Sequence, residues 1–428
     1  MTIYAQDFLG RITQLTETIQ GETRTFNYVY DAAGRLTDVS RNDTLIAVYS
    51  HDANGNRLSR ITPSDTINGG YDAQDRLLTY GNTSYSYTRN GDLSTKVVGT
   101  DTTRYAYDAF GNLFSVRLPD GTLIEYVIDG QNRRVGKKIN GAMMKQWLYG
   151  NQLNIVAELD SADNLVSRFV YGTRINVPHL MFRNGITFRI ISDHLGSVRL
   201  VVNTASGAVV QRMDYDAFGN IHTDTNTGFQ PLGFAGGIYD EHTELTRFMK
   251  RDYDPETGRW TAKDPIGFEG GQTDLYVYVD NDPISSTDPT GLGKICNRSG
   301  QELKVVAGAE DSVPENAMII GENAMTPEGT DWGFVNYNGQ WIKVPDGVLL
   351  VITKPNEFWI TVYQDWYYKI PFVRGLAYWA GRSVRPAKGN QNEGEIKWIN
   401  DILQRVHDRQ KPGGKELEDE RKKCEECR

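Results

Sequence analysis

The first half of the chain alternates apolar and polar residues in short blocks, and each block ends in a turn signal. In FNYVYDAAGRLTDV, Tyr28 and Tyr30 fall on one face of a strand, because successive side chains of a strand point to opposite faces. Asp31 then opens a D-x-x-G tetrad, in which the aspartate caps a turn and the glycine tolerates positive φ. The next strand restarts at Leu36. The block therefore predicts a β-hairpin.

This block is repeated along the chain. It returns as VYSHDANGNRLSR, GGYDAQDRLLTY, YSYTRNGDLST, YAYDAFGNLFSV, the degraded copy YVIDGQNRRVGKKI, and MDYDAFGNIHT. The positions before the turn, 30, 51, 71, 87, 107 and 128, are spaced by 21, 20, 16, 20 and 21 residues. One hairpin cannot bury its own face, so neighbouring units must stack. We expect a mainly β protein with a long, curling antiparallel sheet; from the repeats alone, a β-solenoid without chemistry of its own is an equal alternative.

Composition narrows the class of protein. With 428 residues, about three domains are expected at roughly 150 residues each, and a hydrophobic fraction of 39% suits a folded chain. The net charge of −9 argues against a protein that coats nucleic acid along its whole length. The sequence contains no run of 18 apolar residues, so it predicts no membrane-spanning helix. The first residues, MTIYAQDFLGRITQ, do not resemble a secretory signal. Three cysteines cannot build a disulfide framework. We expect a cytoplasmic protein in the producing cell, exported, if at all, without a signal peptide.

Residues 234–292 carry four specific sub-motifs, RDYDPETGRW, DPIGFEGG, DLYVYVDNDP and DPTGL. Together with the repeats, they resemble the YD repeats and the core-closing segment of the Rhs family, and the resemblance covers about residues 20–292. It implies a β-shell that encloses a C-terminal effector, as in bacterial Rhs effectors and related insecticidal toxin-complex components. It also implies three parts: a YD-repeat shell segment (1–233), a core-closing segment (234–292) and a variable toxin domain (293–428). Known family shells are longer, so we expect a fragment or a shortened relative.

The resemblance also implies an intramolecular aspartyl protease. An arginine and two aspartates of the family match Arg251, Asp264 and Asp288, and the family's cut after the leucine of DPxGL falls between Leu292 and Gly293. Two carboxylates held close together cannot both be ionised, so one serves as acid while the other activates water. One departure is that Phe268 stands where the family usually has leucine. The alternative is that these Asp-Pro pairs only form turns, as other aspartates of the segment do.

The tail after residue 292 differs in character, because the repeat stops and six of the eight tryptophans lie there. At 136 residues it suits one small domain. Alternating apolar positions predict strands near 303–307, 333–337, 340–344, 348–353, 358–363 and 366–370. Apolar residues stepping by 3, 4 and 3 predict a helix over about 395–408. We therefore expect a small α+β domain.

The tail's chemistry is less defined by the sequence. Between Trp366 and Asn392, basic and aromatic residues interleave without an acidic residue, which suits phosphate contact and base stacking. The candidate residues for a nuclease are Trp379, Arg382, Arg385 and His407. A solvated basic face and a plain histidine near a helix end are the structural alternatives.

Other activities stay open at this point. The pair Glu393 and Glu395 resembles the E-x-E of arginine-directed ADP-ribosyltransferases, which would act on a protein and use NAD. Cys424 and Cys427 form only half of a zinc site, so no metal and no cofactor are expected. A non-enzymatic YD-repeat surface or adhesion protein is a further alternative. The resemblance implies as partners a cognate immunity protein, a contractile (type VI) secretion apparatus or toxin-complex machine, and a longer shell partner.

Overall fold

The chain forms two compact units, Met1–Lys294 and Ile295–Arg428. The computed structural model describes residues 2–172, 174, 176–270 and 272–292, and the segments 303–307, 318–320, 332–337, 340–345, 348–354 and 357–362. The described part is dominated by strands, which confirms the mainly β fold class.

The first unit contains a sheet of 22 strands. Each strand pairs antiparallel with the next strand along the chain, so the sheet is one continuous meander. The strands are β1 (Thr2–Gln6), β2 (Ile12–Ile19), β3 (Glu22–Tyr30), β4 (Leu36–Arg41), β5 (Thr44–His51), β6 (Arg57–Ile61), β7 (Thr66–Tyr71), β8 (Leu77–Tyr80), β9 (Thr83–Tyr87), β10 (Leu93–Val98), β11 (Asp101–Tyr107), β12 (Leu113–Arg117), β13 (Leu123–Ile128), β14 (Arg134–Ile139), β15 (Ala142–Tyr149), β16 (Ile155–Leu159), β17 (Leu165–Val170), β18 (Leu180–Arg183), β19 (Ile186–Ser192), β20 (Val198–Asn203), β21 (Val209–Tyr215) and β22 (Ile221–Asp224).

The predicted turn is built by its aspartate. Asp31 Oδ1 accepts hydrogen bonds from the backbone N–H of Ala33 (2.9 Å) and Arg35 (3.0 Å). Its Oδ2 accepts a third from Arg35 Nε at 2.7 Å. Gly34 has φ 86°, a conformation that costs glycine little. The tetrad and the residue after it therefore specify the turn locally, and the same aspartate cap recurs at residues 7–11, 52–56, 72–76, 108–112, 129–133, 160–164 and 216–220.

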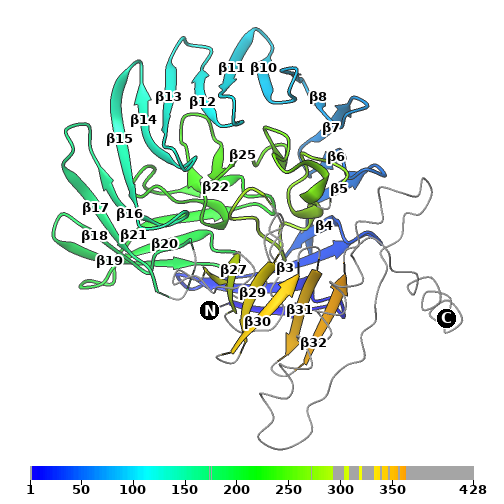
Figure 1. Cartoon of the computed structure of the whole chain (residues 1–428). Helices are drawn as coiled ribbons and strands as arrows, with labels where there is room; N and C mark the ends of the chain where they lie inside the picture. Colours follow the sequence, from blue (N-terminus) through cyan, green and yellow to red (C-terminus); the bar gives the residue numbers. More distant parts are fainter. Residues whose placement is uncertain are drawn as a thin grey trace, which may run out of the picture. The chain divides into compact units, whose positions relative to one another are not determined.

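The strand after the turn carries a β-bulge in most repeats. At the start of β4, Tyr30 faces Leu36 and Val29 faces Asp38, so the residue between has no partner of its own. The same one-residue shift recurs at the start of β6, β8, β12, β14, β16, β20 and β22. A bulge bends its strand and increases the twist. Repeated bulges account for the arc that the strands follow from blue through cyan to green in Figure 1.

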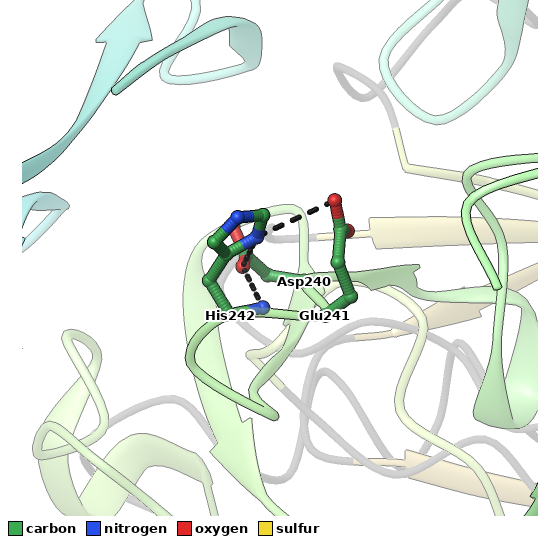
Figure 2. Close-up of side chains that lie close together, drawn as sticks. All are labelled: Asp240, Glu241 and His242. Carbon is green, nitrogen blue, oxygen red and sulfur yellow. Dashed lines mark hydrogen bonds and ion pairs between the residues drawn. The ribbon is translucent and has the colours of Figure 1, made fainter. Parts of the chain in front are cut away.

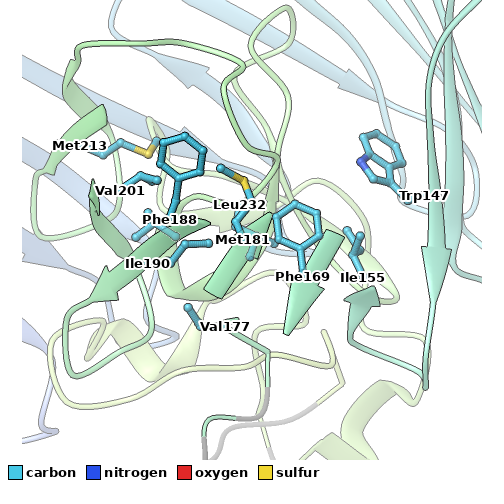
Figure 3. Close-up of a cluster of buried hydrophobic side chains, with 11 residues drawn as sticks. Trp147, Ile155, Phe169, Val177, Met181, Phe188, Ile190, Val201, Met213 and Leu232 are labelled. Atoms are coloured by element: carbon cyan, nitrogen blue, oxygen red, sulfur yellow. The ribbon is translucent and has the colours of Figure 1, made fainter. Parts of the chain in front are cut away.

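The concave face of the arc carries the core. Three clusters of buried apolar side chains lie along it. Figure 3 shows one of them, where Met181, Phe188 and Leu232 meet under β17–β21. Because the strands alternate inward apolar and outward polar residues, the period of two predicted from the sequence places one face of the sheet in this core.

Residues 234–292 form the hub, a small body inside the arc (Figure 1). It has a four-stranded antiparallel sheet and three 3₁₀ turns. The strands are β23 (Ile238–Tyr239), β24 (Thr246–Phe248), β25 (Arg251–Asp254) and β26 (Arg259–Trp260), and the turns are η1 (Phe234–Gly236), η2 (Gly267–Gly270) and η3 (Val279–Asn281). Aromatic rings fill the centre of the hub, namely Phe234, Phe248, Tyr253, Trp260 and Tyr278.

Asparagines at the end of the shell turns hold the hub. Asn112 Oδ1 accepts a hydrogen bond from Arg247 (2.7 Å), and Asn56 Oδ1 accepts one from Arg259 (2.9 Å). Asn220 donates to the carbonyl of Pro255 at 2.9 Å. Where the turn ends in D-x-x-G-N, the fifth residue thus reaches both its own aspartate and the hub.

The second unit is described only by its strands. Strands β27 (Leu303–Ala307), β28 (Met318–Ile320), β29 (Trp332–Tyr337) and β30 (Gln340–Pro345) form a four-stranded antiparallel sheet in the order β28-β27-β29-β30. Strands β31 (Val348–Lys354) and β32 (Glu357–Val362) pair as a hairpin. Five of the strands predicted from the sequence are confirmed to within two residues. The predicted strand at 366–370 and the helix at 395–408 lie outside the described residues.

Candidate active site

The structure brings together the three residues predicted for self-cleavage. Arg251 opens β25, Asp264 lies in the loop after β26, and Asp288 lies near the end of the hub. Their exposed fractions are 3%, 8% and 3%, respectively. The site is therefore formed inside the hub from three separate segments of it.

Arg251 is the centre of the site. Its Nη2 lies 2.8 Å from Asp264 Oδ2 and 3.4 Å from Asp288 Oδ2, so one guanidinium bridges the two carboxylates. Its Nε donates to the carbonyl of Gly291 at 2.5 Å. The guanidinium carbon lies over the Trp260 ring, 4.1 Å from the ring centroid. Ion pairing and stacking together fix the orientation of the arginine.

Asp288 belongs to the turn that precedes the predicted cut. Its Oδ1 accepts hydrogen bonds from Thr290 Oγ1 (3.0 Å), Gly291 N (2.8 Å) and Leu292 N (3.3 Å). Gly291 has φ 67°, and a Cβ there would lie 2.7 Å from the Phe248 carbonyl oxygen. Only glycine fits this position, so the DPTGL turn has a physical reason for its glycine. Leu292 is half-buried, and Gly293 lies outside the described residues.

The environment of Asp264 favours its protonated form. Burial raises the pKa of this carboxyl to about 6, although Arg251 and the backbone N–H of Ile266 act to lower it. Burial likewise lowers the pKa of the Arg251 guanidinium in spite of both aspartates. A carboxyl that exchanges a proton near pH 6 can serve as an acid close to neutrality.

Other aspartates of the hub have structural roles. Asp252 pairs with Arg134 and Arg247, both at 2.8 Å. Asp254 Oδ1 accepts a hydrogen bond from Glu256 N, and Asp282 Oδ1 accepts one from Ser285 N. The interpretation of these residues as turn formers or ion-pair partners therefore fits them. Asp264 and Asp288 cap turns in the same way, since Ile266 N donates to Asp264 Oδ1 and Gly291 N to Asp288 Oδ1, but these two aspartates also share one arginine.

Two further residues at the site lie in the sub-motifs RDYDPETGRW and DLYVYVDNDP, but these motifs assign them no role. Trp260 supports Arg251, and Tyr278 packs edge-on against Trp260 with 5.4 Å between ring centroids. The Tyr278 hydroxyl is buried near the backbone of Asp288. The motifs that contain them mark the segment, but the motifs alone do not show that Trp260 packs on Arg251 and Tyr278 on Trp260, because tertiary packing brings them there.

A second polar cluster lies apart from this site, at Asp240, Glu241 and His242 (Figure 2). Its oxygens and nitrogen are close enough together to suggest a metal centre. However, Lys137 Nζ lies 2.9 Å from Asp240 Oδ1 and 3.0 Å from His242 Nδ1. The ammonium group already supplies the cation, and although burial opposes it, Lys137 lowers the pKa of Asp240. The cluster is thus an ion-pair site that anchors the hub to β14.

The tail candidates Trp379, Arg382, Arg385 and His407, the pair Glu393 and Glu395, and the cysteines lie outside the described residues. Within the described residues, no helix is long and apolar enough to cross a membrane.

Comparison with known proteins identifies the family. The Teneurin YD-shell family profile matches residues 3–284. Mouse Teneurin-4 is 29% identical over 300 residues, which is 66% of this chain and 10% of the relative. The tRNA nuclease WapA of Bacillus subtilis (strain 168) is 27% identical over 295 residues, 67% of this chain and 11% of the relative.

A solved structure of TcdB2–TccC3–TEV is also similar, with a TM-score of 0.36 and 16% identity over 68% of this chain and 20% of that chain. The chain thus spans about a tenth of the length of the curated relatives that it matches. The repeats, the meander and the family profile agree, and the chain belongs to the Teneurin YD-shell family of Rhs/YD-repeat proteins.

Proposed function

We propose that this chain is the C-terminal part of an Rhs-type toxin, in which a YD-repeat shell surrounds an effector and the hub cuts the chain between Leu292 and Gly293. One observation carries the proposal: Arg251 contacts Asp264, Asp288 and the Gly291 carbonyl at once, one residue before the bond to be cut.

The proposed reaction is a hydrolysis in which the two carboxyls take different roles. Asp288 accepts hydrogen bonds at Oδ1, as a carboxylate does, and would take a proton from the attacking water. Asp264 would donate its proton to the leaving nitrogen of Gly293. Water adds to the Leu292 carbonyl carbon, the C–N bond breaks, and the products are a new carboxylate and a new amine. Arg251 would hold the two carboxyls and the Gly291 carbonyl in position.

The intact mass of the purified chain tests this proposal. The parent should divide into two species whose masses add up to the 48.2 kDa chain plus one water, with the boundary after Leu292. Asp264→Asn and Asp288→Asn should each remain whole. Asp280→Asn is the matched control, because Asp280 is an exposed aspartate of the same hub, and it should be cut like the parent. An uncut parent would overturn the protease assignment and favour a fixed surface or adhesion protein.

We infer further that the tail acts on nucleic acid. The support is the interleaved basic and aromatic strip of residues 366–392 and the similarity to a relative named a tRNA nuclease. The whole chain, incubated with tRNA and with DNA, should degrade one of them, and the Arg382→Ala/Arg385→Ala variant should lose this activity. Labelling of protein from radioactive NAD, lost in Glu395→Ala, would instead make the tail an ADP-ribosyltransferase. An immunity protein for the tail, export by a secretion apparatus and action in a target cell belong to the same proposal.

A further inference from the structure

The two ends of the 22-stranded sheet overlap. Gln211 and Met213 of β21 face the inner core, so Arg212 and Asp214, at the alternate positions, point to the outer face. In β2, Leu15 faces the core and Glu17 shares its side. Contacts between these two sets mean that the inner face of β2–β3 lies on the outer face of β20–β21. The sheet is therefore rolled like a scroll.

A network of ion pairs fills this overlap. Arg199 contacts Glu17 at 2.8 Å and Asp214 at 2.9 Å. Arg24 reaches Asp214 at 3.3 Å, and Arg212 reaches it at 2.8 Å. Glu22 pairs with Arg24 at 2.7 Å and with Arg212 at 3.5 Å. We name these three arginines and three carboxylates the latch: Glu17, Glu22, Arg24, Arg199, Arg212 and Asp214.

Side chains alone hold the overlap. In the described part of the chain, β2 pairs only with β1 and β3, and β21 pairs only with β20 and β22. The other end of β2 is anchored differently, because Ile12 N donates to Ser285 Oγ of the hub at 3.0 Å. The N-terminal strands are thus fixed at the hub and held by charges at their far end.

We propose that the latch is the place where the YD-repeat sheet opens, with β1–β3 swinging away from β20–β21 while the remaining ladder stays intact. Opening breaks no β-ladder and leaves six charged groups that water can solvate again, whereas separating any other neighbouring strands breaks backbone hydrogen bonds. Opening at the latch would uncover only the part of the third apolar cluster that β2 and β3 supply, namely Ile12, Leu15 and Tyr28, whereas opening elsewhere would disrupt the two other clusters. All six latch residues lie in the shell, so the latch can open whether or not the chain is cut after Leu292.

Charge reversal with hydrogen–deuterium exchange on the whole chain tests the latch. Arg199→Glu and Glu17→Arg, each alone, should speed amide exchange in residues 12–24 and 199–215 by about tenfold or more, with β8–β14 unchanged. The double variant should recover part of the slow exchange, since the Glu17–Arg199 pair is rebuilt with its charges swapped while the Arg199–Asp214 pair stays lost. Arg133→Glu is the control, because Arg133 pairs with Asp129 within one half-buried turn outside the latch, and its effect should stay at that turn and at its neighbours Tyr149 and Asn151.

The parent chain gives a second measurement that needs no variant. Raising the salt from about 0.05 to about 0.5 M should speed exchange in the same two segments and leave β8–β14 unchanged, because salt screens the partly exposed pairs of the latch. Equal exchange in the single variants and the parent, a rise over the whole sheet, or no recovery in the double variant would overturn the proposal. Asp264→Asn serves as the uncut background, so failure of self-cleavage cannot be mistaken for failure of the latch.

Discussion

The pentapeptide Asp-Ala-Phe-Gly-Asn occurs twice in the shell, at residues 108–112 and 216–220, and its phenylalanine is exposed in the first copy and buried in the second. Phe110 is 78% exposed and Phe218 is 1% exposed. The two turns are otherwise alike: each aspartate Oδ1 accepts hydrogen bonds of 2.8 and 2.9 Å from the same two positions, and each glycine has positive φ. Five residues therefore determine the turn but not the burial of its side chain.

The neighbours of the second copy make the difference. The Phe218 ring lies 3.8 Å from the Arg57 guanidinium carbon and packs edge-on against Tyr49. The Phe218 carbonyl accepts a hydrogen bond from Tyr253 of the hub at 2.8 Å. Local sequence thus builds the turn, and contacts with β5, β6 and the hub decide which turn is buried.

The largest expected contrast is in the phenylalanines themselves. Phe218→Ala should lower the free energy of unfolding by about 3–5 kcal/mol, because it removes a buried ring. Phe110→Ala should change it by no more than about 0.5 kcal/mol. Urea denaturation of the whole chain measures both, and equal effects would contradict the comparison.

The second largest difference in stability is expected for alanine substitutions at the two turn glycines, Gly111 and Gly219. Both have positive φ, so alanine costs about 1–2 kcal/mol at either position. A Cβ on Gly219 would also lie 2.4 Å from the Phe234 ring, whereas a Cβ on Gly111 meets nothing within 4 Å. Gly219→Ala should therefore cost about 2–4 kcal/mol in total. A Gly111→Ala variant that loses as much would show that the turn, not the hub, sets the cost.

The pH dependence of stability should differ between an aspartate of a shell turn, Asp129, and an aspartate of the hub, Asp264. In a shell turn, hydrogen bonds with Arg133 outweigh burial and lower the pKa of Asp129, whereas in the hub burial raises that of Asp264 to about 6. The folded chain then holds a proton on Asp264 that the unfolded chain has released. The contribution of Asp264 to stability should fall by about 1–3 kcal/mol as pH rises from about 4 through 6, measured as the difference between the parent and Asp264→Asn. Unfolding midpoints across that pH range, with Asp129→Asn as the control, measure it.

The smallest contrast is expected in the turn caps. Asp108→Ala and Asp216→Ala should each cost about 1–2 kcal/mol, since both remove the same charged hydrogen bonds. The two costs should agree within about 0.5 kcal/mol. A clear difference in the urea midpoints would mean that the hub also stabilises the turn itself. It would contradict the claim that the five residues alone determine the turn.

The sequence predicts what is local and misses what is tertiary. The aspartate cap, the glycine and the alternation of Tyr28 and Tyr30 predict the hairpins, because each depends on residues less than six apart. The convergence of Arg251, Asp264 and Asp288 followed from resemblance, since a spacing of 24 residues between aspartates implies no contact by itself. The motif RDYDPETGRW contains both Trp260 and Arg251, but it does not predict that the two side chains stack. The latch could not be predicted, because segments far apart in the chain meet there and no local rule orders them.

Self-cleavage within one chain is the central claim, and a mixing experiment tests it most directly. A mass-tagged Asp264→Asn chain is incubated with the parent, and the mass of each is followed. The account predicts that the parent is divided between Leu292 and Gly293 while the tagged variant stays whole at every concentration of parent. A tagged variant cut in the mixture, or a parent that stays whole, would contradict an intramolecular site built from Arg251, Asp264 and Asp288.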